Sequence, residues 1–177
     1  GKNISDGSQR NDTMYGGAEN DTLYADQGSD KAYGELGDDE LHVSADPSNL
    51  PNIIDGGDGT DILVLDGLVS GDYDLTSLVG DASADARFEN METLDIHGDG
   101  ADTNMAITSQ DIINMVDNGA IPKLVVLADS GDSLDVSAIG SGDAAGESVD
   151  PVTFTGDGIY HISIGASEVA QVEWITV

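Results

Sequence analysis

The stretch GSQRNDTMY-GGAENDTLY-ADQGSDKAY-GELGDDELH, residues 7–42, repeats a pattern of nine residues four times. An aspartate ends the small, polar part of each unit, at Asp12, Asp21, Asp30 and Asp39. A leucine, methionine or alanine follows each aspartate after one intervening residue. A short fixed period of this kind predicts a solenoid, in which each coil of the chain stacks on the coil before it.

Each unit combines a tight turn with a short strand. Glycine, asparagine and aspartate tolerate positive φ, so the polar half of a unit can turn sharply and point its carbonyl groups inward. The three residues around the apolar position then form a strand with one side chain in the core. Two units complete one coil, and successive coils should lie about 4.8 Å apart, the usual strand spacing.

This spacing places aspartates of successive coils side by side, Asp12 beside Asp30 and Asp21 beside Asp39. Bare carboxylates at that distance repel by about 1–3 kcal/mol in a partly solvated setting. A cation between them reverses the sign of the interaction. Carboxylates and flexible turn carbonyls form an oxygen-only ligand set that favours Ca²⁺. We therefore expect calcium ions between the coils.

A fifth copy, GGDGTDILV, begins at Gly56, and its Asp61 lies four residues further from Asp39 than one coil requires. The intervening segment contains two prolines and predicts a loop insertion at 43–55 that replaces half a coil. If the extra residues bulge outward, the turn ending at Asp61 can still stack on the turn ending at Asp39.

Three turn pairs are the candidate calcium sites. We rank Gly34–Asp39 with Gly56–Asp61 first, and Gly16–Asp21 with Gly34–Asp39 second. Asp12 with Asp30 comes third, because the neighbouring arginine brings positive charge into that turn. The candidate metal-ligating or turn-forming residues are Asp12, Gly16, Asp21, Asp30, Gly34, Gly37, Asp39, Gly56, Gly57, Gly59 and Asp61.

The shared frame of the units, G-G-x-G-x-D-x-U-x with U apolar, resembles the calcium-binding nonapeptide of RTX proteins. Only the fifth copy fits every position, and the earlier copies replace some glycines, for example by Glu19 and Glu35. The resemblance implies an all-β fold, a calcium-bound parallel β-roll formed by residues 1–66. We expect the roll to continue into a β-rich module with one short helix, residues 67–177.

Composition limits the classes of partner. The 177 residues include 35 Asp and Glu but only 5 Lys and Arg, for a net charge of −30, which argues against nucleic acid and anionic membranes. The chain lacks cysteine, so thiolate sites are excluded. It shows neither a stretch long enough to span a bilayer nor an N-terminal signal peptide. Because it opens at Gly1 in mid-pattern, we expect a part of a larger protein.

The second half has its own strand and helix signals. A helix is expected over about 109–117, with Thr108 or Ser109 as N-cap and Asn118-Gly119 as its end. Two apolar segments, 152–155 and 159–165, flank a Gly-Asp-Gly turn and predict a hairpin. Residues 171–177 predict a last strand.

Taken together, the repeats, the irregular coil with a helix and the terminal strands resemble the C-terminal region of large bacterial adhesins exported by type I secretion. In that family an uncleaved export signal lies at the extreme C-terminus, often as an acid followed by apolar residues, and Glu173–Val177 fits this pattern. The resemblance implies the type I secretion machinery as a partner and an extracellular or cell-surface location, reached without an N-terminal signal peptide.

The sequence lacks H-E-x-x-H, G-x-S-x-G and phosphate-loop motifs, and we expect no enzyme activity. The favoured function is a calcium-dependent folding and type I secretion module of an RTX adhesin. The alternative is an adhesion domain that holds a sugar or protein ligand through calcium. That alternative needs ions with open coordination positions, whereas the repeats predict closed sites between coils.

Overall fold

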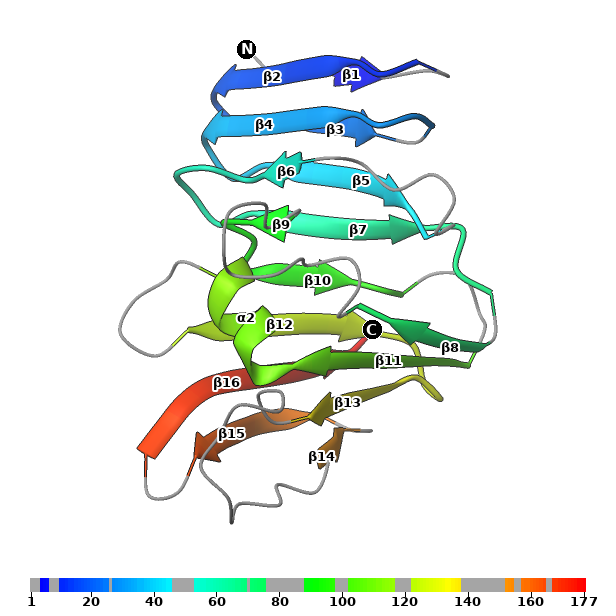
Figure 1. Cartoon of the computed structure of the whole chain (residues 1–177), viewed down its shortest axis with the longest axis vertical. Coiled ribbons are helices and arrows are strands. Elements are labelled where there is room, and N and C mark those ends of the chain that lie inside the picture. Colours follow the sequence, from blue (N-terminus) through cyan, green and yellow to red (C-terminus); the bar gives the residue numbers. More distant parts are fainter. Residues whose placement is uncertain are drawn as a thin grey trace.

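Repeat strands alternate between two parallel sheets in a computed structural model of the chain, so each coil gives one strand to each side of a roll (Figure 1). One side contains β1 (Ile4–Asp6), β3 (Thr22–Ala25), β5 (Glu40–Ser44) and β7 (Ile62–Asp66). The other contains β2 (Thr13–Ala18), β4 (Lys31–Leu36), β6 (Ile53–Asp55) and β9 (Phe88–Glu89). The structure describes residues 4–6, 10–25, 27–45, 53–69, 71–75, 88–97, 102–116, 122–137, 152–154, 157–164 and 167–177.

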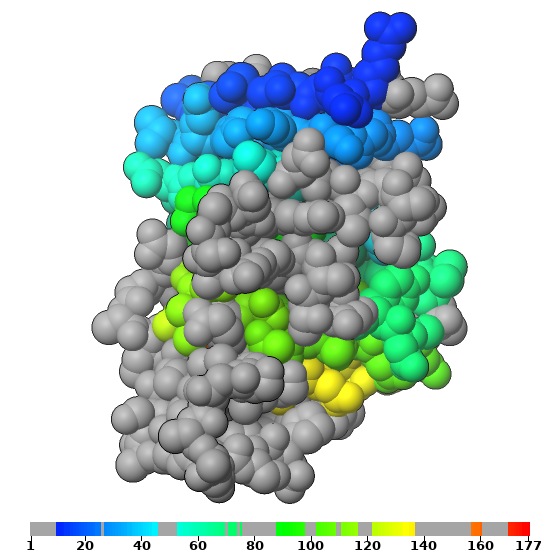
Figure 2. Space-filling model, in the orientation of Figure 1, coloured from blue at the N-terminus to red at the C-terminus, as the bar shows by residue number. Residues whose placement is uncertain are grey.

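The strand register confirms the predicted coil. Thr22 of β3 lies opposite Glu40 of β5, one coil of 18 residues later. Glu40 lies opposite Ile62 of β7, and here the coil is 22 residues long. The space-filling view shows the result as stacked layers, with the first coils in blue above later ones in cyan (Figure 2). The four extra residues therefore leave the stacking intact.

The predicted loop at 43–55 is too long, and the half-coil that it was expected to replace is present. Val43 and Ser44 belong to β5, and Ile53–Asp55 forms β6, which pairs with both β4 and β9. Ile54 is fully buried between the β4 and β9 strands. Ile53 and Ile54 are β-branched, and such residues favour a strand even close to a proline.

The long sheet continues beyond the repeats without a break. After β7 come β10 (Thr93–Asp95), β12 (Lys123–Ala128) and β16 (Ser167–Thr176), all parallel, and then the antiparallel β15 (Gly158–Ile164). A third sheet contains β8 (Gly71–Asp74), β11 (Thr103–Thr108), β13 (Ser133–Ser137) and β14 (Val152–Phe154). This third sheet lies below the β2–β9 sheet in Figure 1.

One apolar column crosses six neighbouring strands of the long sheet, from β3 to β16. Each residue of this column lies directly opposite the next one on the neighbouring strand, and all of them are at most 1% exposed. The column consists of Leu23, Leu41, Leu63, Leu94, Val126 and Trp174. The buried apolar residues of the described part form a single cluster, so the core extends through the position where the repeats end.

The helix α2 (Ser109–Met115) lies where the β2–β9 sheet gives way to the third sheet (Figure 1). Thr108 is its N-cap, as predicted, and forms a reciprocal capping box with Asp111. The helix ends at Met115, two residues before the predicted end, and the predicted stop at 118–119 falls outside the described residues. It packs against β9, β11 and β16. None of the helices in the described part is long and apolar enough to cross a membrane.

The predicted hairpin is wrong. β14 pairs with β13 and β15 pairs with β16, so the two strands belong to different sheets. A glycine-aspartate turn between apolar strands marks a hairpin in many proteins, but it equally marks a corner at which a chain leaves one sheet for another. The local sequence does not distinguish these two outcomes.

Candidate calcium sites in the stacked turns

Three turns stack along one edge of the roll. Residues 16–21 join β2 to β3, residues 34–39 join β4 to β5, and residues 56–61 join β6 to β7. Because the flanking strands are parallel and in register, the same repeat position recurs in each turn. This edge carries nine of the eleven predicted residues: Gly16, Asp21, Gly34, Gly37, Asp39, Gly56, Gly57, Gly59 and Asp61.

 All nine of these residues lie in the three turns, and the remaining two, Asp12 and Asp30, lie at the opposite edge.

The aspartates of this edge form a ladder of hydrogen bonds between coils. The Asp21 amide donates to Oδ1 of Asp39 at 2.7 Å, and the Asp39 amide donates to Oδ1 of Asp61, also at 2.7 Å. The three side chains are at most 2% exposed. One carboxylate oxygen of each lower aspartate is thus fixed by the backbone of the coil above.

The second carboxylate oxygen points into the stack. Oδ2 of Asp39 and Oδ2 of Asp61 are buried, and neither accepts a hydrogen bond from any described residue. Burying a carboxylate oxygen without a partner costs several kcal/mol by order of magnitude, unless a cation or a proton compensates. These two oxygens therefore fit a bound cation.

Glycine allows the oxygens of neighbouring turns to come close together. The point that a Cβ atom on Gly34 would occupy lies 2.3 Å from Asp39 Oδ2 and 2.3 Å from the Gly56 carbonyl oxygen. The same point on Gly16 lies 3.0 Å from Asp21 Oδ2 and 2.7 Å from the Gly34 carbonyl oxygen. We call each such space, bounded by a turn carboxylate and the next turn's carbonyl, a cradle. A side chain at either glycine would collide with these oxygens, so glycine lets a carboxylate and a carbonyl of neighbouring turns come close together. Oxygen ligands of these two kinds are the ones that Ca²⁺ prefers.

The donor set combines side-chain and backbone oxygens. Among the described residues, no group of three or more acidic or histidine side chains converges on one point. Each cradle instead combines one carboxylate with a carbonyl oxygen of the next turn. Such a set lacks the nitrogen and sulfur ligands that Zn²⁺ and Cu²⁺ prefer, so its chemistry favours a hard cation.

The other predicted glycines allow the turns to approach one another. A Cβ atom on Gly59 would lie 1.8 Å from the Gly37 carbonyl oxygen, and one on Gly57 would lie 2.3 Å from the Glu35 carbonyl oxygen. Gly37 and Gly57 also have positive φ, 131° and 96°. Their role is to permit the stacking that brings carboxylates and carbonyls together.

The opposite edge repeats the arrangement at Asp12 and Asp30. The Asp12 amide donates to Oδ1 of Asp30 at 2.8 Å, and Asp30 Oδ2 is buried and accepts no hydrogen bond within the described part. Gly28, which the sequence analysis left out of the site, lies here: its Cβ would be 2.5 Å from the Arg10 carbonyl oxygen. Its signal was its place as the third glycine of the frame. Residues 7–9 and 26 lie outside the described part.

Burial raises the pKa of Asp61 to about 7. The hydrogen bond from the Asp39 amide opposes this shift, and the Glu92 and Asp39 carboxylates add to it. Burial also raises the pKa of Asp30 and of Asp39, again against the hydrogen bond from the amide of the coil above. These acids hold their protons more tightly than free aspartate until a cation takes the proton's place.

The ladder extends one step beyond the repeats. The Asp61 amide donates to Oε2 of Glu92 at 2.9 Å, the position that an aspartate occupies in the repeats. Glu92 was not among the predicted site residues, because it belongs to no nine-residue unit. Asp132, beside the third sheet, makes a similar contact: its Oδ1 accepts a hydrogen bond from the Thr103 amide at 2.9 Å. Its Oδ2, however, accepts one from the Asp129 amide at 2.7 Å. Each carboxylate oxygen of Asp132 therefore has a backbone donor, one in the neighbouring coil and one in its own turn.

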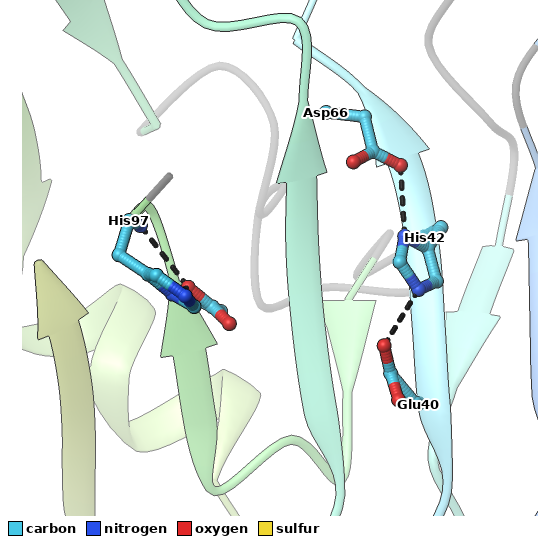
Figure 3. Close-up of polar contacts among 5 residues, drawn as sticks. Glu40, His42, Asp66 and His97 are labelled. Carbon is cyan, nitrogen blue, oxygen red and sulfur yellow. Dashed lines mark hydrogen bonds and ion pairs between the residues drawn. The ribbon is translucent and has the colours of Figure 1, made fainter. Parts of the chain in front are cut away.

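A separate polar cluster lies on the outer face of β5 and β7 (Figure 3). His42 bridges Glu40 and Asp66, with 2.8 Å from Nε2 to Glu40 Oε1 and 2.8 Å from Nδ1 to Asp66 Oδ2. The ring of His42 also stacks on Tyr24 of the preceding coil, with 4.3 Å between centroids. This cluster ties three coils together at the surface and shares no residue with the cradles.

Comparison with protein families gives one match. Residues 6–41 and 51–67 match the family model described as RTX calcium-binding nonapeptide repeat (4 copies). These ranges contain every predicted site residue. RTX nonapeptide repeats bind calcium, which confirms Ca²⁺ as the cofactor expected from the sequence, and proteins with such repeats are typically exported and extracellular. Searches among curated proteins and solved structures gave no match to the chain.

Proposed function

We propose that the chain is a calcium-dependent folding and type I secretion module of an RTX adhesin, because residues 6–41 and 51–67 match RTX calcium-binding repeats. The observation that carries the proposal is the pair of buried Oδ2 oxygens, on Asp39 and Asp61, that accept no hydrogen bond from the described residues. A fold that buries them is costly until calcium binds. Calcium availability then decides whether the roll forms.

Charge strengthens this dependence. A chain with a net charge of −30 repels itself when cations are scarce, which favours an open form suited to export. Outside the cell, calcium binds the folded turns but not the open chain. At a calcium concentration about 100 times Kd, each site then adds about 2.7 kcal/mol to the free energy of unfolding. Since a domain's whole stability is only about 5–15 kcal/mol, two or three sites suffice to switch it.

We place the export signal at Glu173–Val177. In the folded chain Trp174 is 1% exposed, and Glu173 forms an ion pair with Lys123, with Nζ and Oε2 2.7 Å apart. A signal with a buried tryptophan is readable only while the chain is unfolded. This fits a partner that receives the open chain, in the type I secretion machinery, and a fold that forms after export.

The proposal includes no catalytic activity. The inward-facing cradles favour a folding role over the alternative, a calcium-dependent sugar or protein ligand site, because a ligand would need coordination positions open to solvent. The adhesin assignment rests on the resemblance of the repeat block and the terminal strands to that class.

Circular dichroism and thermal melting in EDTA, followed by a calcium titration, test the folding role. We expect a cooperative gain of β-structure and a large rise in Tm as calcium is added. Magnesium at the same concentration and ionic strength is the control, because it prefers a smaller, octahedral site. Equal β-structure and equal Tm in EDTA and in calcium would contradict the proposal.

Export is tested separately, in a bacterial host that carries a type I secretion system. Deleting Glu173–Val177 should abolish release of the chain into the medium, whereas the Lys123→Gln variant, which removes the ion pair to Glu173 and keeps the terminal residues, should still be released. Undiminished release of the deletion variant would remove the signal from these residues.

A further inference from the structure

We infer that a third calcium cradle lies just beyond the repeats, formed by the turn Gly56–Asp61 and the segment Asn90–Glu92. The inference rests on the calcium-binding role proposed above. Asn90 and Glu92 lie outside both ranges matched by the repeat family, 6–41 and 51–67. The site would bind Ca²⁺ between the last repeat turn and a segment with no repeat signature.

Register brings this segment under the last repeat turn. Asp55 of β6 lies opposite Glu89 of β9, and Ile62 of β7 lies opposite Thr93 of β10. The residues that follow β9 and precede β10 therefore stack on the turn that joins β6 to β7. In Figure 1, β9 and β10 continue the two sides of the roll directly below β6 and β7.

The oxygens at this position match those of the two cradles above. The point that a Cβ atom on Gly56 would occupy lies 2.6 Å from Asp61 Oδ2 and 2.0 Å from the Asn90 carbonyl oxygen. Asp61 is fully buried, and its Oδ2 accepts no hydrogen bond from the described residues. Asn90 thus supplies the carbonyl that Gly34 and Gly56 supply in the cradles above.

Glu92 takes the place of the lower aspartate. Its Oε2 accepts the Asp61 amide at 2.9 Å, whereas aspartate Oδ1 atoms accept the equivalent amides at 2.7 Å. The lower segment runs from Asn90 to Glu92, three residues fewer than the turn from Gly56 to Asp61. The additional methylene of glutamate lets a carboxylate reach the ladder position from this shorter segment. Glu92 is 8% exposed, so its charge lies close to the buried Asp61.

The segment is held in a conformation suited to this role. Asn90 has φ of 54°, a left-handed value that asparagine adopts more readily than most residues. Its side-chain amide donates to Asp55 Oδ1 at 2.8 Å. Met91 is buried, and its amide donates to the carbonyl of Met115 in α2 at 2.9 Å. An ion here would therefore tie the repeats to the helix and, through it, to the second half of the chain.

Asp132 shows why this position, and not every buried acid, is assigned to calcium. Asp132 also accepts an amide of the neighbouring coil, yet its Oδ2 accepts a second bond from the Asp129 amide. Its two oxygens are satisfied by backbone. Asp61 Oδ2 faces a carbonyl oxygen instead, and two facing acceptors need a cation or a proton between them.

The Glu92→Gln variant tests the site, because glutamine keeps the shape and removes the charge. Calorimetric titration with calcium should show one fewer bound ion per chain than the unmodified protein, or a loss of at least tenfold in affinity at one site. The matched control is Glu89→Gln, which removes one charge from the same segment, on β9. It should keep the full stoichiometry.

Two failures are distinguishable. If the unmodified chain binds no calcium, the proposed function itself is wrong. If the unmodified chain binds calcium and Glu92→Gln binds it with the same stoichiometry and affinity, the third cradle is wrong and the folding role stands.

A measurement on the unmodified protein guards against a variant that does not fold. Amide hydrogen exchange should show that calcium protects peptides covering 88–95 to an extent similar to peptides covering 34–41. If calcium protects peptides covering 34–41 but leaves peptides covering 88–95 unprotected even at saturation, the inference is overturned.

Discussion

Leu63, in the last repeat, and Leu94, beyond the repeats, lie opposite each other in the parallel pair β7 and β10, and both are 1% exposed. This contact carries the apolar column from the repeat block into the second half of the chain. The boundary expected at residue 66 therefore lies inside a continuous sheet. Whether the two parts also unfold together is an energetic question, which the Leu94→Ala variant addresses.

Leu94→Ala should destabilise both parts at once. Removing a fully buried leucine side chain typically costs about 2–5 kcal/mol, through lost burial and the cavity that remains. In saturating calcium, denaturant curves from circular dichroism and from Trp174 fluorescence should shift together. Leu36→Ala, at a position 53% exposed, is the control and should change the free energy of unfolding by less than about 0.5 kcal/mol. Two separate transitions, with only one shifted, would show independent parts.

Asp39→Asn should remove at least one calcium site. Asp39 anchors the Asp21 amide with one oxygen and lines the cradle below Gly34 with the other. At calcium about 100 times Kd, we expect the calcium-dependent part of the free energy of unfolding to fall by about 2.7 kcal/mol or more. Calorimetry and denaturation at fixed calcium measure both effects. Asp72→Asn, on β8 and away from the repeat turns, should leave calcium uptake unchanged, and an Asp39→Asn variant with full uptake would contradict the site.

Stability in EDTA should fall as the pH rises. Folded Asp61 keeps its proton up to about pH 7, whereas an unfolded aspartate loses it near 3.8. Between these values the folded chain binds more protons, so its stability is greatest at low pH and declines as the pH rises through 7. Denaturation between pH 4 and 8 in EDTA measures this trend, which should be weaker in Asp61→Asn. Stability that rises over this range would refute the raised pKa.

Calcium binding should show the opposite pH dependence. The cradle carboxylates must lose their protons to bind the ion, so calcium competes with protons. For each proton displaced, apparent affinity should fall by about tenfold per pH unit below about pH 7. Calcium titrations at about pH 5.5, 6.5 and 7.5, at equal salt concentration, measure how the apparent calcium affinity changes with pH. An affinity independent of pH would mean that Asp61 is already ionised without calcium.

Glu35→Gly should stabilise the roll. Glu35 is exposed and has φ of 74°, a left-handed value that costs a residue with a Cβ atom about 1 kcal/mol and costs glycine little. We expect a gain of about 0.5–1 kcal/mol in denaturation at saturating calcium. Leu36→Gly, at the next residue and with ordinary φ, is the control and should lose stability. A loss of stability in Glu35→Gly would indicate that the Glu35 carboxylate matters more than its backbone strain.

The sequence predicts the period-dependent features well, because stacking forces equivalent positions to repeat. The coil length, the inward aspartates and the glycines of the turns all depend on the spacing of Asp12, Asp21, Asp30 and Asp39 alone. The N-cap of the helix, Thr108, depends on a local hydrogen bond and is equally predictable.

Features that depend on long-range pairing were harder to predict. Glu92 enters the ladder only because β10 pairs with β7, and no local pattern marks it. Ile54 lies in a segment with the composition of a proline-containing loop, and its full burial against neighbouring coils explains why the segment forms a strand. The turn at Asp157 has the composition of a hairpin, but the two flanking strands find different partners.

The 18-residue coil gives the roll a parity. Deleting a single nine-residue unit would move every later strand to the opposite sheet and every later aspartate to the opposite edge, whereas deleting two adjacent units would preserve both. The four-residue insertion between Asp39 and Asp61 escapes this rule, because β5 and β7 remain paired in register across it. The length of such a chain can therefore vary in pairs of repeats without moving any later strand to the other sheet or any later turn to the other edge.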